Sequence, residues 1–69
     1  MDASQIIVNG RTLEAALPSS IEQFLISRQL PPKSVVVEHN GEAVAPSEFA
    51  GRLLQNGDRV EVVKIVAGG

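Results

Sequence analysis

The sequence predicts an α+β fold in which one main helix covers one face of a mixed sheet of four to five strands. Two Asn-Gly pairs, Asn9-Gly10 and Asn40-Gly41, each lie between short β-branched runs, which is the strongest local signal for a β-hairpin. One amphipathic segment lies between the two pairs. The 69 residues, 43% of them hydrophobic, suit a single ordered domain of residues 1–69.

The first hairpin joins a strand at Gln5–Val8 to a second strand at residues 11–17. Both central residues of a type I′ turn need positive φ, which Asn and Gly adopt readily. We therefore expect the two strands to pair antiparallel, with Pro18 ending the second.

The main helix is predicted to begin directly after Pro18. The run from Ser19 to Glu22 matches a capping box, in which a Ser oxygen accepts a hydrogen bond from the N3 amide and Glu22 reaches back. Apolar residues at three-to-four spacing give the helix one buried face: Ile21, Phe24, Leu25 and Leu30. Pro31-Pro32 cannot continue a helix, so we expect it to end near Leu30.

The second hairpin consists of a third strand at residues 34–39 and a short return at Glu42–Val44. A right-handed crossover through the helix places the third strand parallel to the second or to a near neighbour.

After Pro46, the apolar pairs Phe49/Leu53 and Ala50/Leu54 are four residues apart and predict a short helical turn. A turn at residues 56–58 then leads into the last strand, residues 59–66. This strand is expected beside the first, with Val60 and Val62 buried.

Composition excludes several classes of function. The chain has no cysteine, which removes disulfides, thiolate metal ligands and a catalytic thiol. Six Lys and Arg residues, with two Phe and no Tyr or Trp, give no basic or base-stacking surface for nucleic acid. Neither a membrane span nor a signal peptide is visible, so we expect a cytoplasmic protein.

The carboxyl terminus is the most informative feature. The apolar run of the last strand is followed almost at once by Ala67, Gly68 and Gly69. Glycine has no Cβ, so such a tail can thread a narrow channel and present an unshielded carboxyl group. We expect residues 67–69 to form a flexible tail whose terminus is the site of chemistry.

The chain resembles the ThiS family, the sulfur carrier proteins of thiamine biosynthesis, which have the ubiquitin-like β-grasp fold. The resemblance runs from about Gln5 to Gly69. It rests on these residues: IIVNG from Ile6, the capping serine, VVVEHNGEAV from Val35, Pro46, Phe49, Leu54, Gly57-Asp58 and the ending VEVVKIVAGG. Members often carry Arg after the proline, where this chain has Ser47. A partner contact made by that Arg would be absent or altered here.

The resemblance implies that a ThiF-like adenylyltransferase, using ATP and Mg²⁺, converts the Gly69 carboxylate to an acyl adenylate. Sulfur from a persulfide donor then gives a thiocarboxylate, and thiazole synthase takes the sulfur. Residues 67–69 would enter the active sites of these partners. The chain itself would be a protein co-substrate, monomeric when free, with no bound cofactor or metal.

Other functions remain open on the residues alone. The carrier could serve molybdopterin or cysteine synthesis. The chain could instead be a ubiquitin-like modifier that forms isopeptide bonds through Gly69, or a β-grasp interaction module whose terminal glycines are incidental.

The remaining polar residues are interpreted as structural. His39 is expected to be a solvent-facing strand residue and not a general base or metal ligand, since no second histidine or cysteine accompanies it. Asp58 and Glu61 are expected in a turn and on an outer strand face. Gly41 and Gly57 are turn glycines, because no phosphate-loop pattern surrounds them.

The last strand also predicts a partner-binding patch. If Val60 and Val62 point inward, Val63 and Ile65 share the outer face, which is more apolar than a solvent-exposed face needs to be. Ile7 on the first strand could extend this patch. The alternative is a bulge after Val62 that buries Val63 and Ile65 and exposes Lys64.

Overall fold

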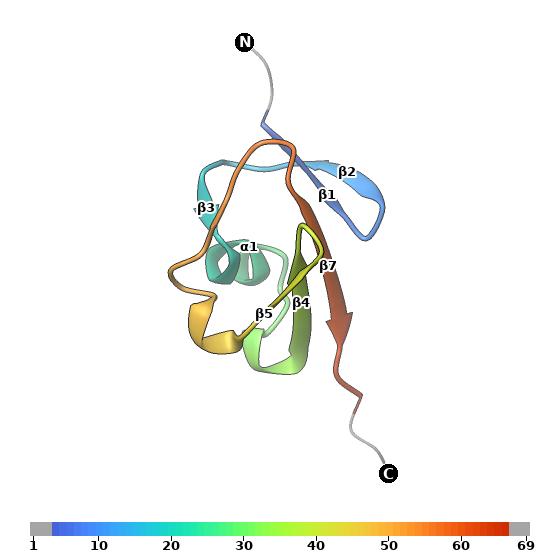
Figure 1. The fold of residues 1–69 in the computed structure, drawn as a ribbon, viewed down its shortest axis with the longest axis vertical. Helices are drawn as coiled ribbons and strands as arrows, with labels where there is room; N and C mark the ends of the chain where they lie inside the picture. Colours follow the sequence, from blue (N-terminus) through green and yellow to red (C-terminus); the bar gives the residue numbers. More distant parts are fainter. Residues whose placement is uncertain (1–3, 67–69) are drawn as a thin grey trace.

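A mixed five-stranded sheet forms the body of the protein in the computed structural model, which describes residues 4–66 (Figure 1). The strand order across the sheet is β2-β1-β7-β4-β5. Its strands are β1 (Gln5–Val8), β2 (Arg11–Glu14), β4 (Val35–His39), β5 (Glu42–Val44) and β7 (Arg59–Lys64). β1 and β7 pair in parallel, and the other neighbours are antiparallel. β4 therefore runs in the same direction as β2, as the crossover predicts, with β1 and β7 between them.

Both predicted hairpins are confirmed. Asn9 and Gly10 have φ of 50° and 83°, and Asn40 and Gly41 have φ of 52° and 84°. These positive values are the ones that a type I′ turn requires. The paired strands are shorter than predicted, since β2 ends at Glu14 and not at residue 17.

The helix α1 (Ile21–Ser27) begins one residue later than the capping-box prediction placed it. Ser20 is the N-cap, and its hydroxyl accepts a hydrogen bond from the Gln23 amide at 3.0 Å. The Gln23 side chain in turn accepts from the Ser20 amide at 3.2 Å. The predicted pair of Ser19 and Glu22 is therefore wrong. Ser20 is buried against the core, and this burial selects between two capping patterns one residue apart.

The α-helix also ends earlier than predicted, at Ser27. Gln29 has a φ of +60°, which breaks the right-handed helical conformation before the two prolines are reached. The Leu30 amide still donates to the Leu25 carbonyl at 2.8 Å, so Leu30 packs at the edge of the core. A 3₁₀ turn, η1 (Pro32–Ser34), then leads into β4.

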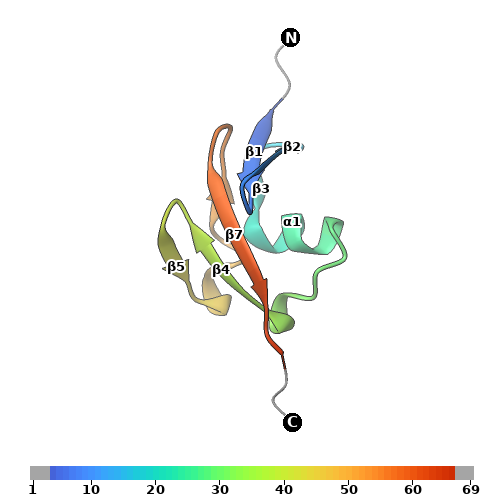
Figure 2. The same ribbon diagram turned by 90° about the vertical axis from the view of Figure 1, so that its right-hand side faces the viewer.

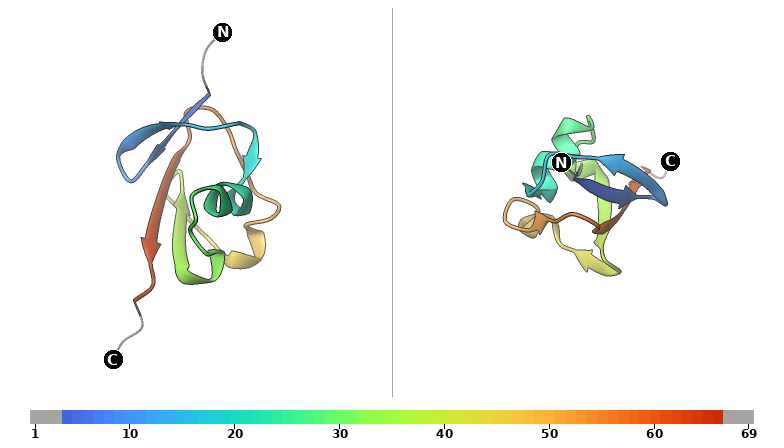
Figure 3. Two further views of the ribbon diagram at one scale, coloured as in Figure 1. Left: turned by 180° about the vertical axis from the view of Figure 1, so that it is seen from behind. Right: turned by 90° about the horizontal axis from the view of Figure 1, so that it is seen from above.

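The helical turn predicted between Pro46 and Leu54 is only partly right. A 3₁₀ turn, η2 (Pro46–Glu48), is present, but Leu53 and Leu54 form the strand β6 (Leu53–Leu54). β6 pairs with β3 (Ser19–Ser20), and Figure 3 shows the two segments side by side, in cyan and orange. The carbonyls of Phe49 and Arg52 accept hydrogen bonds from the first two amides of α1, so this segment caps the helix instead of forming one.

The core lies between α1 and the inner face of the sheet, and Figure 2 shows α1 on one side of the strands. Its members come from every layer: Ile6, Ile21, Phe24, Leu25, Val35, Val37, Val44, Phe49, Leu54, Val60 and Val62. The predicted burial of Val60 and Val62, in a last strand beside the first, is confirmed. In the part of the chain that the structure describes, no helix covers the other face of the sheet.

Candidate functional site

The strand β7 delivers the chain toward its carboxyl terminus. It runs to the end of the molecule where η1 and the start of β4 lie (Figure 1). Within residues 4–66, the last backbone contact with that region is made by the Ile65 amide, which donates to the Ser34 carbonyl at 2.8 Å. Regular strand structure ends at Lys64 and not at residue 66. The predicted tail residues, Ala67, Gly68 and Gly69, lie outside the described residues.

Asn9 holds the middle of β7 with its side chain, a role that the sequence analysis did not foresee. Its Oδ1 accepts from the Val62 amide at 2.8 Å, and its Nδ2 donates to the Val62 carbonyl at 3.1 Å. The side-chain amide thus takes the place of the backbone N–H and C=O that one more residue of β1 would offer to β7. The backbone itself has already turned away at Asn9-Gly10. The Asn-Gly pair therefore forms the hairpin and also fixes the strand that carries the tail.

The outer face of β7 is apolar toward the tail. Val62 is buried, Val63 is 62% exposed and Ile65 is 56% exposed. Inward and outward side chains alternate without interruption from Val60 to Val63, so the alternative of a bulge that buries Val63 is wrong.

Val36 belongs to the same surface and was missed from the sequence. It pairs directly with Val63 across β4 and β7 and is 53% exposed. We call Val36, Val63 and Ile65 the apolar patch. The inward positions of Val35 and Val37 would have placed Val36 outward, had the parity argument been applied to β4 as well.

Ile7 is not brought next to the apolar patch. It lies half-buried opposite Arg59, four positions before Val63 on β7. That offset corresponds to about 13 Å along a strand. Glu38 and Glu61, which pair directly across β4 and β7, lie between the two levels and bound the patch with negative charge.

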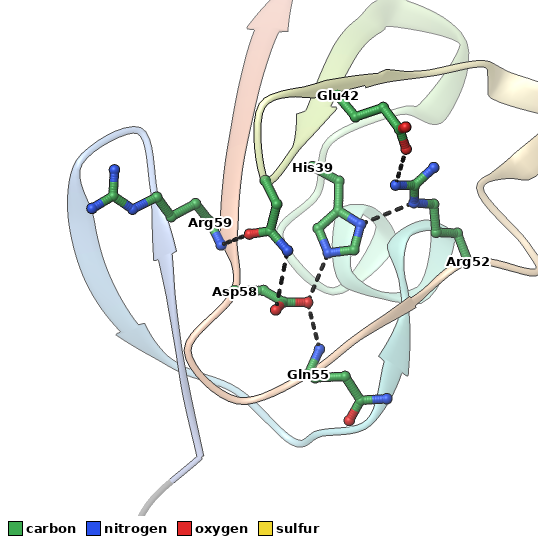
Figure 4. Close-up of polar contacts among 7 residues, drawn as sticks. His39, Glu42, Arg52, Gln55, Asp58 and Arg59 are labelled. Carbon is green, nitrogen blue, oxygen red and sulfur yellow. Dashed lines mark hydrogen bonds and ion pairs between the residues drawn. The ribbon is translucent and has the colours of Figure 1, made fainter.

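His39 is buried, so its prediction as a solvent-facing residue is wrong. It follows Val35 and Val37 at the inward positions of β4. Arg52 Nε donates to His39 Nδ1 at 2.9 Å, which makes Nδ1 an acceptor. The ring hydrogen is therefore on Nε2, which donates to Asp58 Oδ2 at 2.7 Å (Figure 4). Both ring nitrogens are used in structural bonds, and none is available to a substrate.

Asp58 organises the turn before β7. Its Oδ2 also accepts from the Gln55 amide at 2.9 Å, and its Oδ1 accepts from Asn40 Nδ2 at 3.3 Å (Figure 4). Burial acts to raise the pKa of Asp58, but the hydrogen bonds from His39, Gln55 and Asn40 outweigh it and leave the pKa lowered. The carboxylate thus stays charged as a structural acceptor.

Arg52 connects this network to the surface. Its guanidinium binds the carboxylate of Glu42 on β5 and lies 3.4 Å from that of Glu48 on η2. The hydrogen bond to Glu42 is the main reason that the pKa of Arg52 is raised, although partial desolvation opposes it. We call the buried His39 and its partly exposed partners Arg52 and Asp58 the His39 triad. It lies at the start of β7, whereas the apolar patch lies at its end.

Other kinds of site have little support within residues 4–66. No group of three or more His, Cys, Asp or Glu side chains there could hold a metal ion. None of the helices in this range is long and apolar enough to cross a membrane. The positive φ of Gly41 and Gly57, 84° and 88°, confirms both as turn glycines.

These features define a ubiquitin-like β-grasp protein, in which the sheet packs against one helix and the last strand comes directly before the terminal residues. The model of the ThiS family matches residues 4–69. The chain therefore belongs to the ThiS family of sulfur carrier proteins.

Solved structures agree with this assignment. The chain is similar to the crystal structure of a thiamine biosynthesis protein (ThiS) from Geobacter metallireducens, with a TM-score of 0.82 and 26% identity over 94% of this chain and 99% of that one. A solution structure of a thiamine biosynthesis protein from the same organism gives a TM-score of 0.77 and 28% identity, covering 94% and 87% of the two chains.

A curated relative is much longer. Over 65 residues, 94% of this chain, the sequence is 31% identical to a thiazole synthase from Magnetococcus marinus. The matched part is 20% of that protein, so the chain spans about a fifth of its length.

Proposed function

We propose that this protein carries sulfur on its terminal carboxyl group for thiazole formation in thiamine biosynthesis. The observation that carries the proposal is the family match, which extends through Gly68 and Gly69. The thiazole synthase relative favours thiazole formation over molybdopterin or cysteine synthesis, because a segment similar to this chain is part of that longer polypeptide.

The terminus must be activated before sulfur can enter. A carboxylate is a poor electrophile, because its charge is delocalised and oxide is a poor leaving group. A ThiF-like adenylyltransferase would join the Gly69 carboxylate to AMP from ATP with Mg²⁺, releasing pyrophosphate. AMP is then the leaving group when sulfur attacks the carbonyl carbon.

Sulfur would come from a persulfide on a partner. Its terminal sulfur attacks the acyl adenylate, AMP leaves, and cleavage of the sulfur–sulfur bond by a thiol leaves a thiocarboxylate on Gly69. Thiazole synthase would take up that sulfur and return the carrier to its carboxylate form. The chain would act as a co-substrate, since it has no cysteine and its one histidine is engaged in the His39 triad.

The apolar patch suits docking beside the reactive tail. Val36, Val63 and Ile65 are each more than half exposed, and Ile65 lies four residues before Gly69. Exposed apolar clusters commonly mark interaction sites. We propose that the adenylyltransferase grips this patch while the tail enters its active site. Ile7, further along the same face, is proposed as an outlying contact.

The test changes only the terminus. Deleting Gly69, or adding one residue after it, should abolish thiocarboxylate formation by the cognate adenylyltransferase and sulfur donor, as measured by intact-protein mass spectrometry. The same residue added before Met1 is the matched control and should leave the reaction unchanged. Sulfur transfer by the carboxyl-extended protein at the wild-type rate would reject the carrier function. Higher-mass conjugates on denaturing gels of cell extract would instead indicate a protein modifier.

A further inference from the structure

The backbone of β7 bonds to its two neighbours in strict alternation. The Ile65 amide donates to Ser34 and the Asn40 amide donates to the Arg59 carbonyl, both at 2.8 Å. With Val36 opposite Val63, these contacts direct the backbone groups of odd-numbered β7 residues toward β4. The even-numbered residues therefore face β1.

On the β1 side, pairing stops abruptly. The Asn9 amide donates to the Val60 carbonyl at 3.0 Å, and the Asn9 side chain holds both backbone groups of Val62. The chain then reverses at Asn9-Gly10. The next even-numbered residue, Lys64, directs its N–H and C=O to an edge that no strand within residues 4–66 occupies. Ile65 still bonds to Ser34, so a continuation of the same alternation would place the backbone groups of Val66, which is 85% exposed, on this open edge as well.

We propose that an extended segment of the enzyme that activates Gly69 binds at this open edge. The segment would add to the sheet as a strand beside β7 and bond to the backbone groups of Lys64 and Val66. The inference rests on the proposed function, because it names how that partner holds the chain. Strand addition takes its affinity from main-chain hydrogen bonds and its specificity from alternate side chains. It therefore suits residues that come directly before a tail without large side chains.

The side chains around the open edge fit such a segment. Val63 and Ile65 are exposed on the outer face, directly beside the unpaired groups, and offer apolar contact to alternate residues of an added strand. In the sequence, Lys64 and Val66 come directly before residues 67–69. A strand bound at the open edge would therefore hold the backbone next to the tail, which side-chain contacts at the apolar patch alone would not do.

A second copy of the chain is a poorer occupant. Two identical edges that pair around a twofold axis near Lys64 would bring the two Lys64 side chains close together. Like charges opposite each other on neighbouring strands are unfavourable, and lysine on an edge strand is a common device against self-association. Lys64 thus favours a different partner, one that places a polar or acidic group beside its ammonium.

Total chemical synthesis of the 69-residue chain allows a direct test. Replacing the amide of Val66 by an ester removes its N–H and leaves every side chain intact. One lost hydrogen bond should weaken binding to the adenylyltransferase about tenfold and raise the KM for the carrier, with kcat and the melting temperature unchanged. An ester at Glu61 is the control: it removes an N–H directed at β4, so it should lower the melting temperature and leave the affinity of the folded protein unchanged.

Each other outcome overturns the inference. Unchanged affinity of the Val66 ester would show that the open edge is not used. A lower melting temperature for this ester would show that its N–H serves the fold of the chain itself. A wild-type dimer in sedimentation that the ester dissociates would assign the edge to a second copy. Failure of the unmodified chain to be adenylated at all would reject the proposed function. If the unmodified chain is adenylated and only the ester result fails, the proposed function stands and the role of the open edge is rejected.

Discussion

β7 begins among side-chain hydrogen bonds and ends among exposed apolar side chains. At its start, Asp58 accepts from His39, Gln55 and Asn40, and Arg52 extends the contacts to the surface. At its end, Val63 and Ile65 face solvent, and one backbone edge of Lys64 meets no strand within residues 4–66. Polar groups that are buried and fully bonded specify one arrangement, whereas exposed apolar groups and open edges remain available to partners.

The difference separates stability from recognition along one strand. The hydrogen bonds at the start of β7 fix the direction of the strand, because the turn at residues 55–58 is hydrogen-bonded to both β4 and β1. The end of β7 can then be left open without loss of the fold. Changes at the two ends should therefore have opposite effects on melting and on partner binding, and the variants Asp58→Ala and Val63→Glu test this.

The largest effect on stability is expected at the His39 triad. Asp58→Ala leaves the Nε2–H of buried His39 without its acceptor and removes the acceptor of the Gln55 amide. An unsatisfied buried donor together with the lost bonds should cost about 2–3 kcal/mol of unfolding free energy, measured by urea denaturation. Affinity of the folded variant for the adenylyltransferase should stay at the wild-type value. A loss of affinity equal to the loss of stability would contradict the separation of the two ends.

The converse result is expected at the apolar patch. Val63→Glu places a charge at a centre of apolar contact and should weaken binding to the adenylyltransferase by about 2 kcal/mol, as measured by calorimetry. Melting should change little, since the side chain is already 62% exposed. Ile26→Glu is the matched control, because it puts the same charge at an aliphatic side chain of similar exposure, 61%, on α1, which covers the other face of the sheet. Equal losses for both variants would indicate a general charge effect and reject the patch.

The sequence predicted what local chemistry determines. Both Asn-Gly turns, the order of the two hairpins and the main helix, and the outward direction of Val63 follow from turn preferences and strand alternation, and these are confirmed. Local rules failed where two of them competed. The sequence SSIEQ contains two capping patterns, and packing of Ser20 against the core selected the second.

Contacts between distant residues account for the other errors. Leu53 and Leu54 form a strand only because β3 is available to pair with them, 34 residues earlier in the chain at Ser19 and Ser20. His39 was misplaced although strand parity pointed it inward, because its partners Arg52 and Asp58 lie 13 and 19 residues away. A histidine with both nitrogens bonded can be buried at little cost, and nothing in its immediate sequence announces those bonds.

The smallest expected effect is a dependence of stability on pH at the start of β7. The pKa of Asp58 is lowered in the folded protein from its ordinary value of 3.8. A carboxyl group of this kind stabilises the fold above its unfolded pKa, and the contribution is lost as pH falls through the folded pKa. The effect should be modest, because burial of Asp58 opposes the hydrogen bonds that lower its pKa. The difference in unfolding free energy between wild type and Asp58→Asn should therefore shrink as pH is lowered from 5 to below 3.8, while titratable groups that do not contact Asp58 cancel. A difference that grows on acidification would mean that the folded protein favours the protonated carboxyl group, and would reject the assignment of Asp58 as the charged acceptor in the His39 triad.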